Sequence, residues 1–346
     1  MNEDRVRPVR RSRGTGHARI EDVARHAQVS AQTVSRFFRD PRQVSSGVAE
    51  RIRISVEAIG YVPNLVAGAL ASNRSFIVAI LVPTIANPIH AAPVQALSDI
   101  LRPAGYQVLV GTTDYDPTRE QDLVAAFIGR RVDGIVLTGT SFTDYTARIL
   151  ARACIPVVQL WELPRHPIDM AVGVDNDAAG IAVARHFFER GYRRFAVLGH
   201  DAAGDTRSAA RLDGFDRETR RLGLAPPHHF SYSRPTDMTQ AAEMLARLKA
   251  PGREADAVFC VGAPIAIGLV LTAPKLGIAI PGELAVAAFG DNDLAPLLSP
   301  ALTTVGIPRY ELGRKAGEML LRRFAGQQVE APVVDIGFTL LARETT

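Results

Sequence analysis

The chain beyond residue 75 is organised around short apolar runs, rich in Val, Ile and Leu, that alternate with amphipathic helical stretches. Eight such runs follow one another: FIVAILVP, YQVLVGTT, VDGIVLTGT, IPVVQLWE, FAVLGH, DAVFCVG, ELAVAAFGD and LTTVGIP. Uninterrupted apolar strands separated by helices are typical of a parallel sheet covered on both faces. We therefore predict an α/β fold with two doubly wound parallel-sheet lobes over residues 75–346, which bind ligands at the carboxyl ends of their strands.

Residues 19–63 have a different pattern, in which apolar residues recur every three or four positions. This spacing predicts three short helices joined by tight connections. Ser30 is placed to cap the second helix, Ser45 or Ser46 to cap the third, and Gly60 to end it. We therefore expect a small helical head ahead of the two lobes.

Positive charge is concentrated in the first fifth of the chain. Residues 1–64 contain 12 Lys and Arg against 7 Asp and Glu, whereas the remainder contains 28 against 29. A basic module on a nearly neutral body is typical of a protein that meets a polyanion with one end. Part of the excess positive charge lies in residues 1–18, which we expect to be a basic disordered tail. For that part, a merely solvated tail is the alternative to binding a polyanion.

The predicted second helix has an apolar face and a polar face. Val34 and two phenylalanines can pack against the neighbouring helices, whereas Gln32 and Arg36 share the opposite side with Ser35 beside them. Arg bonds bidentately to guanine and Gln to adenine, and the small Ala31 allows close approach to bases. The preceding helix, the capping serine and the basic context favour a helix-turn-helix over a merely solvated polar face.

Other function classes lack support in the sequence. The longest apolar run, Phe76–Val82, is too short to cross a bilayer. Cys154 and Cys260 lie in apolar, strand-like runs, which favours buried free thiols and a cytoplasmic protein. We find no P-loop, HExxH or GxSxG motif and no metal-ligand spacing, and interpret His228 and His229 as part of a Pro-flanked loop. We expect a protein that is not an enzyme, with no cofactor and no metal.

Longer motifs resemble a known family. Two consecutive segments are similar to the DNA-binding head and hinge of the lactose/galactose-repressor family of bacterial transcription regulators. They are IEDVARHAQVSAQTVSRFFRDPRQVS and GYVPNLVAGALAS. The resemblance continues through VGVDNDAAG, FFERGYRR, RLDGF, GIAIPGELAVAAFGD and PALTTVGIP, and VSRFFRDPRQVS, DMAVGVDN and DIGFTL resemble its gluconate-responsive branch. The resemblance implies lobes of the periplasmic-binding-protein type and a repressor of carbohydrate or sugar-acid metabolism genes.

The resemblance also implies roles for residues of the head and of a hinge over residues 64–74. Base contacts are implied for Ala31, Gln32 and Arg36, and phosphate contacts for Ser30, Thr33, Ser35 and Asn64. Leu70 matches a leucine that wedges into the minor groove, and Ala67 allows two hinges to approach; a contact with the effector lobe is the alternative for Leu70. Gln28 replaces a turn glycine, which predicts a strained turn, and Gly68 weakens the hinge helix.

A small effector between the lobes is implied as well. Arg211 in DTRSAARLDGF matches an arginine that holds the effector, and Arg207 lies one helical turn earlier. A guanidinium in a dry cleft suits a carboxylate, phosphate or diol, and a surface helix is the alternative location for both arginines. The other candidate lining residues are Asn87, Tyr115, Thr138, Trp161, Asp175 and Asp291, with core packing an equal alternative for Trp161.

The predicted pocket lacks acceptors that the family has. Gly262 and Ala263 replace an Asn-Asp pair, and Gly290 replaces the first of two aspartates. Neutral sugars need such acceptors for their hydroxyl groups, so their loss shifts the expected effector toward an anion, such as the sugar acid gluconate. A degraded or different effector site is the open alternative.

We also expect a homodimer, because one short recognition helix reads few base pairs and a two-fold protein matches a palindromic double-stranded operator. The alternative from another functional class is a sugar-binding protein of a transport or sensory system. Such a protein would need an export signal where this chain has its helical head.

Overall fold

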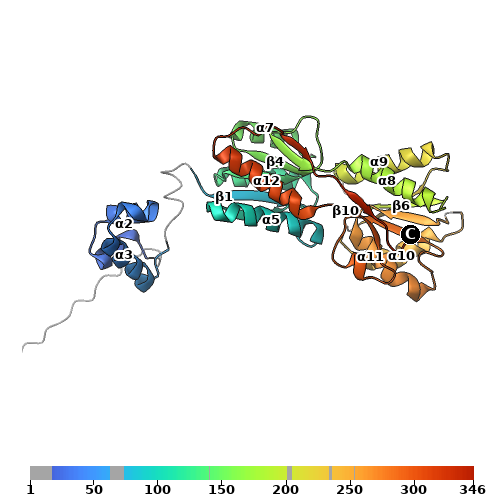
Figure 1. Ribbon diagram of the computed structural model, residues 1–346, viewed down its shortest axis with the longest axis horizontal. Helices are drawn as coiled ribbons and strands as arrows, with labels where there is room; N and C mark the ends of the chain where they lie inside the picture. The colour runs from blue at the N-terminus through green and yellow to red at the C-terminus, as the bar shows by residue number, and fades with distance from the viewer. Residues whose placement is uncertain (1–17, 63–73, 140, 201–204, 234–235, 253) are drawn as a thin grey trace, which may run out of the picture. The chain divides into compact units, whose positions relative to one another are not determined.

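The computed structural model describes residues 18–62, 74–139, 141–200, 205–233, 236–252 and 254–346. Their contacts divide the chain into two units, residues 1–75 and 76–346 (Figure 1). In the described ranges, no helix combines the length and the apolar character needed to cross a membrane.

The first unit is a head of three helices: α1 (Ile20–Ala27), α2 (Ala31–Arg39) and α3 (Ser46–Ile59). Each helix contributes at least one fully buried apolar side chain to a shared core, namely Val23, Val34 and Ile52. Ser45 occupies the N-cap position of α3, and Gly60 ends it in the left-handed conformation. The three predicted helices and their ends are therefore confirmed.

The turn between α1 and α2 contains a strained residue. Gln28 has φ 53° and ψ 49°, in the left-handed region, and its N–H bonds to carbonyl groups of the last turn of α1. A side chain in this region costs roughly 1–2 kcal/mol, a penalty that glycine avoids. The predicted strain at the position of the missing glycine is confirmed.

Replacing Gln28 with glycine should stabilise the head by about 0.5–1 kcal/mol, because relief of strain exceeds the added chain entropy of glycine. Hydrogen exchange of the head amides in the full-length protein should slow about two- to fivefold. Gln43→Gly, at an exposed position, is the matched control and should not slow exchange. Faster exchange in Gln28→Gly would show that the left-handed turn is not strained.

The described residues of the second unit form two six-stranded sheets, one in each lobe. The sheet of lobe 1 has the order β11-β5-β4-β3-β1-β2 and is wholly parallel, whereas that of lobe 2 has the order β12-β10-β9-β8-β6-β7, with β12 antiparallel to β10. The strands of lobe 1 are β1 (Ile77–Val82), β2 (Gln107–Thr112), β3 (Gly134–Thr138), β4 (Val157–Trp161), β5 (Met170–Gly173) and β11 (Val333–Asp335). Those of lobe 2 are β6 (Phe195–His200), β7 (His228–Tyr232), β8 (Ala257–Cys260), β9 (Ala285–Phe289), β10 (Thr303–Gly306) and β12 (Thr339–Leu341).

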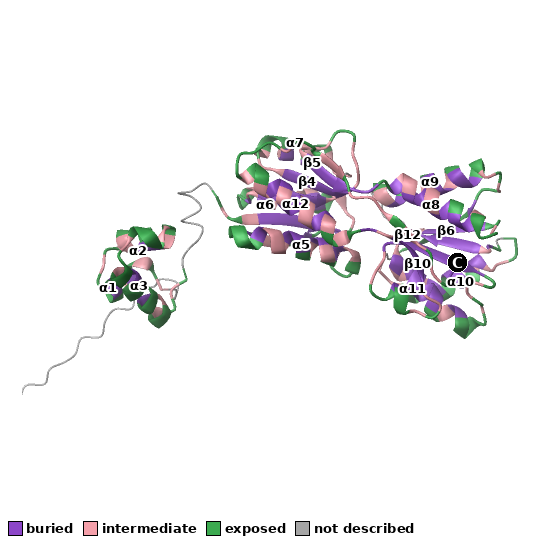
Figure 2. Cartoon of the chain, viewed as in Figure 1, coloured by how far each residue is buried: buried purple, intermediate pink, exposed green. Residues whose placement is uncertain are grey.

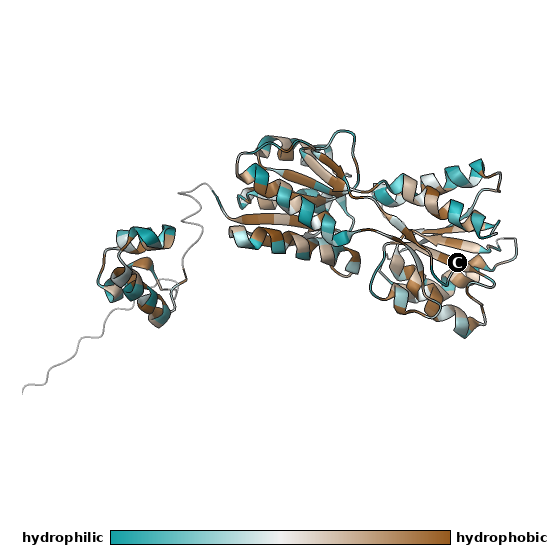
Figure 3. Cartoon of the chain, in the orientation of Figure 1, coloured by the Kyte–Doolittle hydropathy of each residue, from teal (hydrophilic) through white to brown (hydrophobic). Residues whose placement is uncertain are grey.

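Helices cover both faces of each sheet, which explains why the central strands are apolar on both sides (Figures 2 and 3). Along β1, Val78 and Ile80 pack on one face and Ala79 and Leu81 on the other, and all four are buried. Lobe 1 is covered by α5 (Ala91–Leu101), α6 (Pro117–Gly129), α7 (Asp144–Ala153) and α12 (Arg309–Phe324). Lobe 2 is covered by α8 (Asn176–Glu189), α9 (Thr206–Arg221), α10 (Ala241–Leu248) and α11 (Ala263–Thr272).

The chain passes between the lobes three times, after β5, after β10 and after β11. The first passage leads directly into α8, which packs closely against α9 on lobe 2. The second leads into α12, which returns to pack against α5 on lobe 1. Side chains near the first passage can therefore touch both lobes.

All eight apolar runs contain a strand, so the predicted α/β class and the two parallel-sheet lobes are confirmed. Four further strands, β5, β7, β11 and β12, are missed because they are short or carry polar residues. The interpretation of His228 and His229 as a loop is wrong, because both begin β7, an edge strand with one face exposed. Burial of Cys154 is also wrong: it ends α7 in the left-handed conformation and is exposed, whereas Cys260 is buried.

Candidate DNA interface and effector site

Helix α2, the predicted recognition helix, is held in place by its apolar face. Val34 is fully buried, and the Phe37 ring packs edge-on against Phe38 with centroids 5.4 Å apart. Gln32 and Arg36 are both exposed on the other side. The helix therefore presents a Gln/Arg surface on a fixed support.

Hydroxyl groups gather at the start of α2. The Ser30 Oγ accepts a hydrogen bond from the Thr33 N–H at 3.1 Å, and the two hydroxyl oxygens lie 2.8 Å apart. Ser30 is exposed, whereas Ala31, Thr33 and Ser35 are half-buried. The predicted hinge contacts Asn64, Ala67 and Leu70 lie outside the described residues, as does Gly68.

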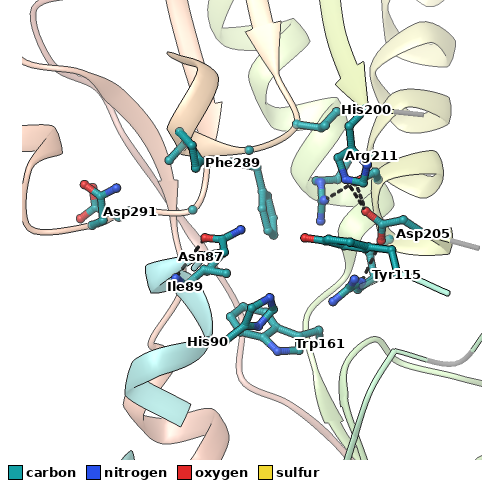
Figure 4. A pocket seen from close by; sticks show the side chains of 18 of the residues that line it. Asn87, Ile89, His90, Tyr115, Trp161, His200, Asp205, Arg211, Phe289 and Asp291 are labelled. Atoms are coloured by element: carbon teal, nitrogen blue, oxygen red, sulfur yellow. Dashed lines mark hydrogen bonds and ion pairs between the residues drawn. The ribbon is translucent and has the colours of Figure 1, made fainter. Parts of the chain in front are cut away.

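A cavity lies between the two lobes where the carboxyl ends of strands from both sheets meet (Figure 4). The space free of protein atoms within its lining is about 670 Å³, and this volume includes open solvent. Lobe 1 contributes Asn87, Ile89, His90, Tyr115 and Trp161. Lobe 2 contributes His200, Asp205, Arg207, Ser208, Arg211, Tyr232, Val261, Gly262, Ala263, Pro264, Phe289, Gly290, Asp291 and Asn292.

Arg211 is the most buried cation in this cavity, with 6% of its surface exposed. Its Nη1 donates to the Asn176 Oδ1 at 2.6 Å and its Nη2 donates to the Ser208 Oγ at 2.9 Å. Its guanidinium carbon lies 3.8 Å from the centroid of the Phe289 ring. Burial lowers the pKa of Arg211 to about 10, which still leaves it protonated at neutral pH. Within the described residues it forms no ion pair.

Arg207 differs from Arg211 in having a carboxylate partner. Its Nε lies 2.9 Å from Asp205, and the same carboxylate lies 2.9 Å from the His200 Nε2. Burial opposes ionisation of Asp205, but the charge of Arg207 and the hydrogen bond from His200 hold its pKa well below the ordinary value. Asp205 is therefore a carboxylate that compensates Arg207.

Several polar atoms of lining residues have no hydrogen-bond partner within the described part of the chain. They are the His90 Nδ1, the His200 Nδ1, the Arg211 Nε and the Tyr232 hydroxyl. Burial lowers the pKa of His90 to about 3, so its imidazole is neutral at neutral pH. The wall formed by Val261, Ala263, Pro264 and Phe289 is apolar by contrast. One side of the cavity thus offers hydrogen-bond donors and acceptors to a polar ligand, whereas the other side is apolar.

The structure brings together six of the eight predicted effector residues. Asn87, Tyr115, Trp161, Arg207, Arg211 and Asp291 all line the cavity. Thr138 and Asp175 do not: Thr138 donates to the carbonyl of Leu81 on the neighbouring strand β1 at 2.7 Å, and Asp175 caps α8. Asp291 is held by Arg343, whose Nη1 is 3.0 Å away, and by the Thr304 hydroxyl. Trp161 belongs to the core and to the cavity wall at once.

Other lining residues escape prediction from the sequence. His200 ends a predicted strand, so the rule that ligands bind at carboxyl ends points to its neighbourhood without identifying its side chain. Asp205 and Ser208 lie in the same segment as Arg211 and carry no separate signal. Asn176 does not line the cavity but contacts Arg211, and nothing in VGVDNDAAG distinguishes it from its neighbours. Within the described residues no cluster of His, Cys, Asp or Glu is arranged to hold a metal ion.

Family models match both units. Residues 19–64 match the lacI family of bacterial regulatory proteins, and residues 184–346 match a periplasmic binding protein-like domain. The HTH-type transcriptional regulator GntR of Pseudomonas aeruginosa is 34% identical over 97% of each chain. The Escherichia coli regulator of the same name is 30% identical over 93% of this chain and 96% of its own.

Solved structures show the same architecture. A LacI-family transcriptional regulator from Silicibacter pomeroyi superposes with a TM-score of 0.89 at 28% identity, covering 95% of this chain and 99% of the other. Transcription regulator GntR from Chromobacterium violaceum gives 0.74 at 34% identity, covering 78% and 98%. The helical head and the two-lobed binding domain thus define a DNA-binding transcriptional regulator with an effector-binding domain. The chain belongs to the lacI family of bacterial regulatory proteins.

Replacing Arg36 with alanine should weaken binding to a specific operator by about 1–3 kcal/mol and relax base preference at one position in each half-site. The physical reason is loss of a bidentate contact to a base edge. Duplexes selected from a random library by the wild-type and variant proteins provide the measurement. Equal weakening on selected and random duplexes would contradict a base-reading role for Arg36.

Proposed function

We propose that this chain is a cytoplasmic, homodimeric repressor that binds a palindromic operator and responds to a sugar acid such as gluconate between its lobes. It acts by binding and not by catalysis. The choice of ligand rests on the burial and the hydrogen-bond partners of the Arg211 guanidinium. It is a buried guanidinium that contacts no carboxylate in the described residues, although Asp205 and Glu162 act on its charge from a greater distance, and its Nε–H is unpaired. Burying a charge with no counter-charge in contact is costly, so an anionic ligand is favoured at this position.

The surroundings support the same ligand class. Asp205 is in direct contact with Arg207, at 2.9 Å, whereas the Nε–H of Arg211 is left for a ligand. The His200 Nδ1 and the Tyr232 hydroxyl are suited to ligand hydroxyl groups. The relatives named GntR agree with the motifs that resemble the gluconate-responsive branch.

Exposed apolar side chains support the proposed dimer. The edge strand β2 exposes Leu109 and Val110, although strands of this kind are normally protected. Lobe 2 exposes Leu271, Leu276, Leu294 and Leu297 on α11 and in the segments that follow α11 and β9. A second copy of the chain that covers these side chains would also supply the second head for a palindromic operator.

Sodium gluconate should raise the free energy of unfolding by about 2.7 kcal/mol at a concentration one hundred times its Kd. Sorbitol, which keeps the polyol chain and lacks the carboxylate, should have little effect. Thermal unfolding measures both. Equal effects of gluconate and sorbitol would contradict the proposed anionic ligand.

Arg211→Gln keeps a hydrogen-bonding side chain and removes the charge, so it should abolish the stabilisation by gluconate. Arg217→Gln is the matched control, because Arg217 lies on the same helix, is exposed and pairs with Asp177. A full gluconate response in Arg211→Gln would remove Arg211 from the proposed site.

A further inference from the structure

We infer that Asn176 is a positioning residue of the effector site, which fixes the Arg211 guanidinium without neutralising it and ties it to the main chain of Trp161. The inference rests on the proposed effector site and extends it to a residue that does not line the cavity. Asn176 begins α8, directly after the first passage between the lobes, and only 6% of its surface is exposed. It is therefore placed to contact both lobes.

The side chain of Asn176 is not used to cap its helix. The neighbouring Asp175 performs that role, since its carboxylate accepts a hydrogen bond from the Ala178 N–H at 2.9 Å. The Asn176 amide is turned inward instead. Its contacts therefore serve tertiary structure and not the start of α8.

Both ends of the Asn176 amide are occupied, and this fixes its orientation. The Nδ2 donates to the Trp161 carbonyl at 2.8 Å and to the Val174 carbonyl at 3.3 Å. Since carbonyl oxygens only accept, the amide nitrogen must face them and the Oδ1 must face Arg211. Asn176 thus presents an acceptor to the Nη1 of Arg211 in a single defined position.

The chemistry of this position favours a neutral amide. An aspartate here would place an oxygen against two carbonyl oxygens and a negative charge against Arg211. That charge would compensate the guanidinium internally and compete with an anionic ligand. Asparagine supplies the geometry of a carboxylate contact without its charge. With Ser208 on Nη2 and Phe289 against the planar face, the Nε–H edge remains unpaired.

The backbone of Arg211 is fixed by the same helix. A Cβ at Gly180, one turn after Asn176, would overlap the carbonyl oxygen of Arg211, and a Cβ at Gly214 would overlap that of Asp177. These two glycines let α8 and α9 approach closely. The first two turns of α8 therefore position Arg211 at both its backbone and its guanidinium.

The contact with Trp161 extends this arrangement to lobe 1. Trp161 ends β4 with φ 77°, an uncommon conformation for a residue with a side chain, and its ring lies edge-on to His90 with centroids 5.9 Å apart. Both rings line the cavity. One amide thus joins the cation on lobe 2 to the aromatic wall on lobe 1.

Isothermal titration with sodium gluconate tests the inference on the full-length protein. Asn176→Ala should weaken gluconate binding tenfold or more, and Asn176→Asp a hundredfold or more because its charge compensates Arg211. Asp177→Asn, next along α8 with an exposed ion pair to Arg217, is the matched control and should bind as the wild type does. Wild-type affinity in Asn176→Asp would overturn the inference.

Fluorescence supplies a test that needs no ligand, since Trp161 is the only tryptophan in the chain. Both Asn176 variants should increase quenching of Trp161 by acrylamide at least twofold, whereas Asp177→Asn should leave it unchanged. If the wild type does not bind gluconate, the proposed ligand fails, and this measurement still decides the role of Asn176. Unchanged quenching in both Asn176 variants would overturn the tie to Trp161.

Discussion

The burial of the Arg211 guanidinium is the interaction on which the effector site depends. Removing such a group from water costs several kcal/mol unless hydrogen bonds and a counter-charge compensate it. The protein supplies the hydrogen bonds through Asn176 and Ser208 and packs Phe289 against the guanidinium face. The Asp205 carboxylate acts on the charge of both arginines, but it is in contact with Arg207 and not with Arg211. We propose that this difference between the two arginines favours an anionic ligand.

The fold places that arginine where the two lobes meet. In a parallel sheet, the carboxyl ends of the strands lie along one edge. In this chain the carboxyl-end edges of the two sheets face the same cavity. The first passage of the chain between the lobes leads straight to Asn176, at the start of α8. A ligand that touches His90 and Arg211 together contacts both lobes, so its binding favours one relative arrangement of them.

The sequence predicts the fold more completely than it predicts the site. The apolar runs locate the central strands, because burial on both faces demands a continuous run of apolar residues. Strands β7 and β11 are missed, because edge strands and very short strands do not need such a run. Arg211 and its neighbours are predicted through resemblance of the DTRSAARLDGF segment. Thr138 and Asp175 do not line the cavity, because each of these polar side chains bonds to a backbone group instead. Asn176 is not predicted, because its role depends on the close approach of α8 and α9 and on the position of the Trp161 carbonyl.

The central claim is that one anion site between the lobes is coupled to operator binding. Such coupling is reciprocal, so it is measured most directly by titrating gluconate into the free protein and into the protein saturated with operator duplex. We expect the two gluconate affinities to differ about five- to 150-fold, by the same factor by which gluconate changes operator affinity. Equal gluconate affinities in the two titrations would contradict it.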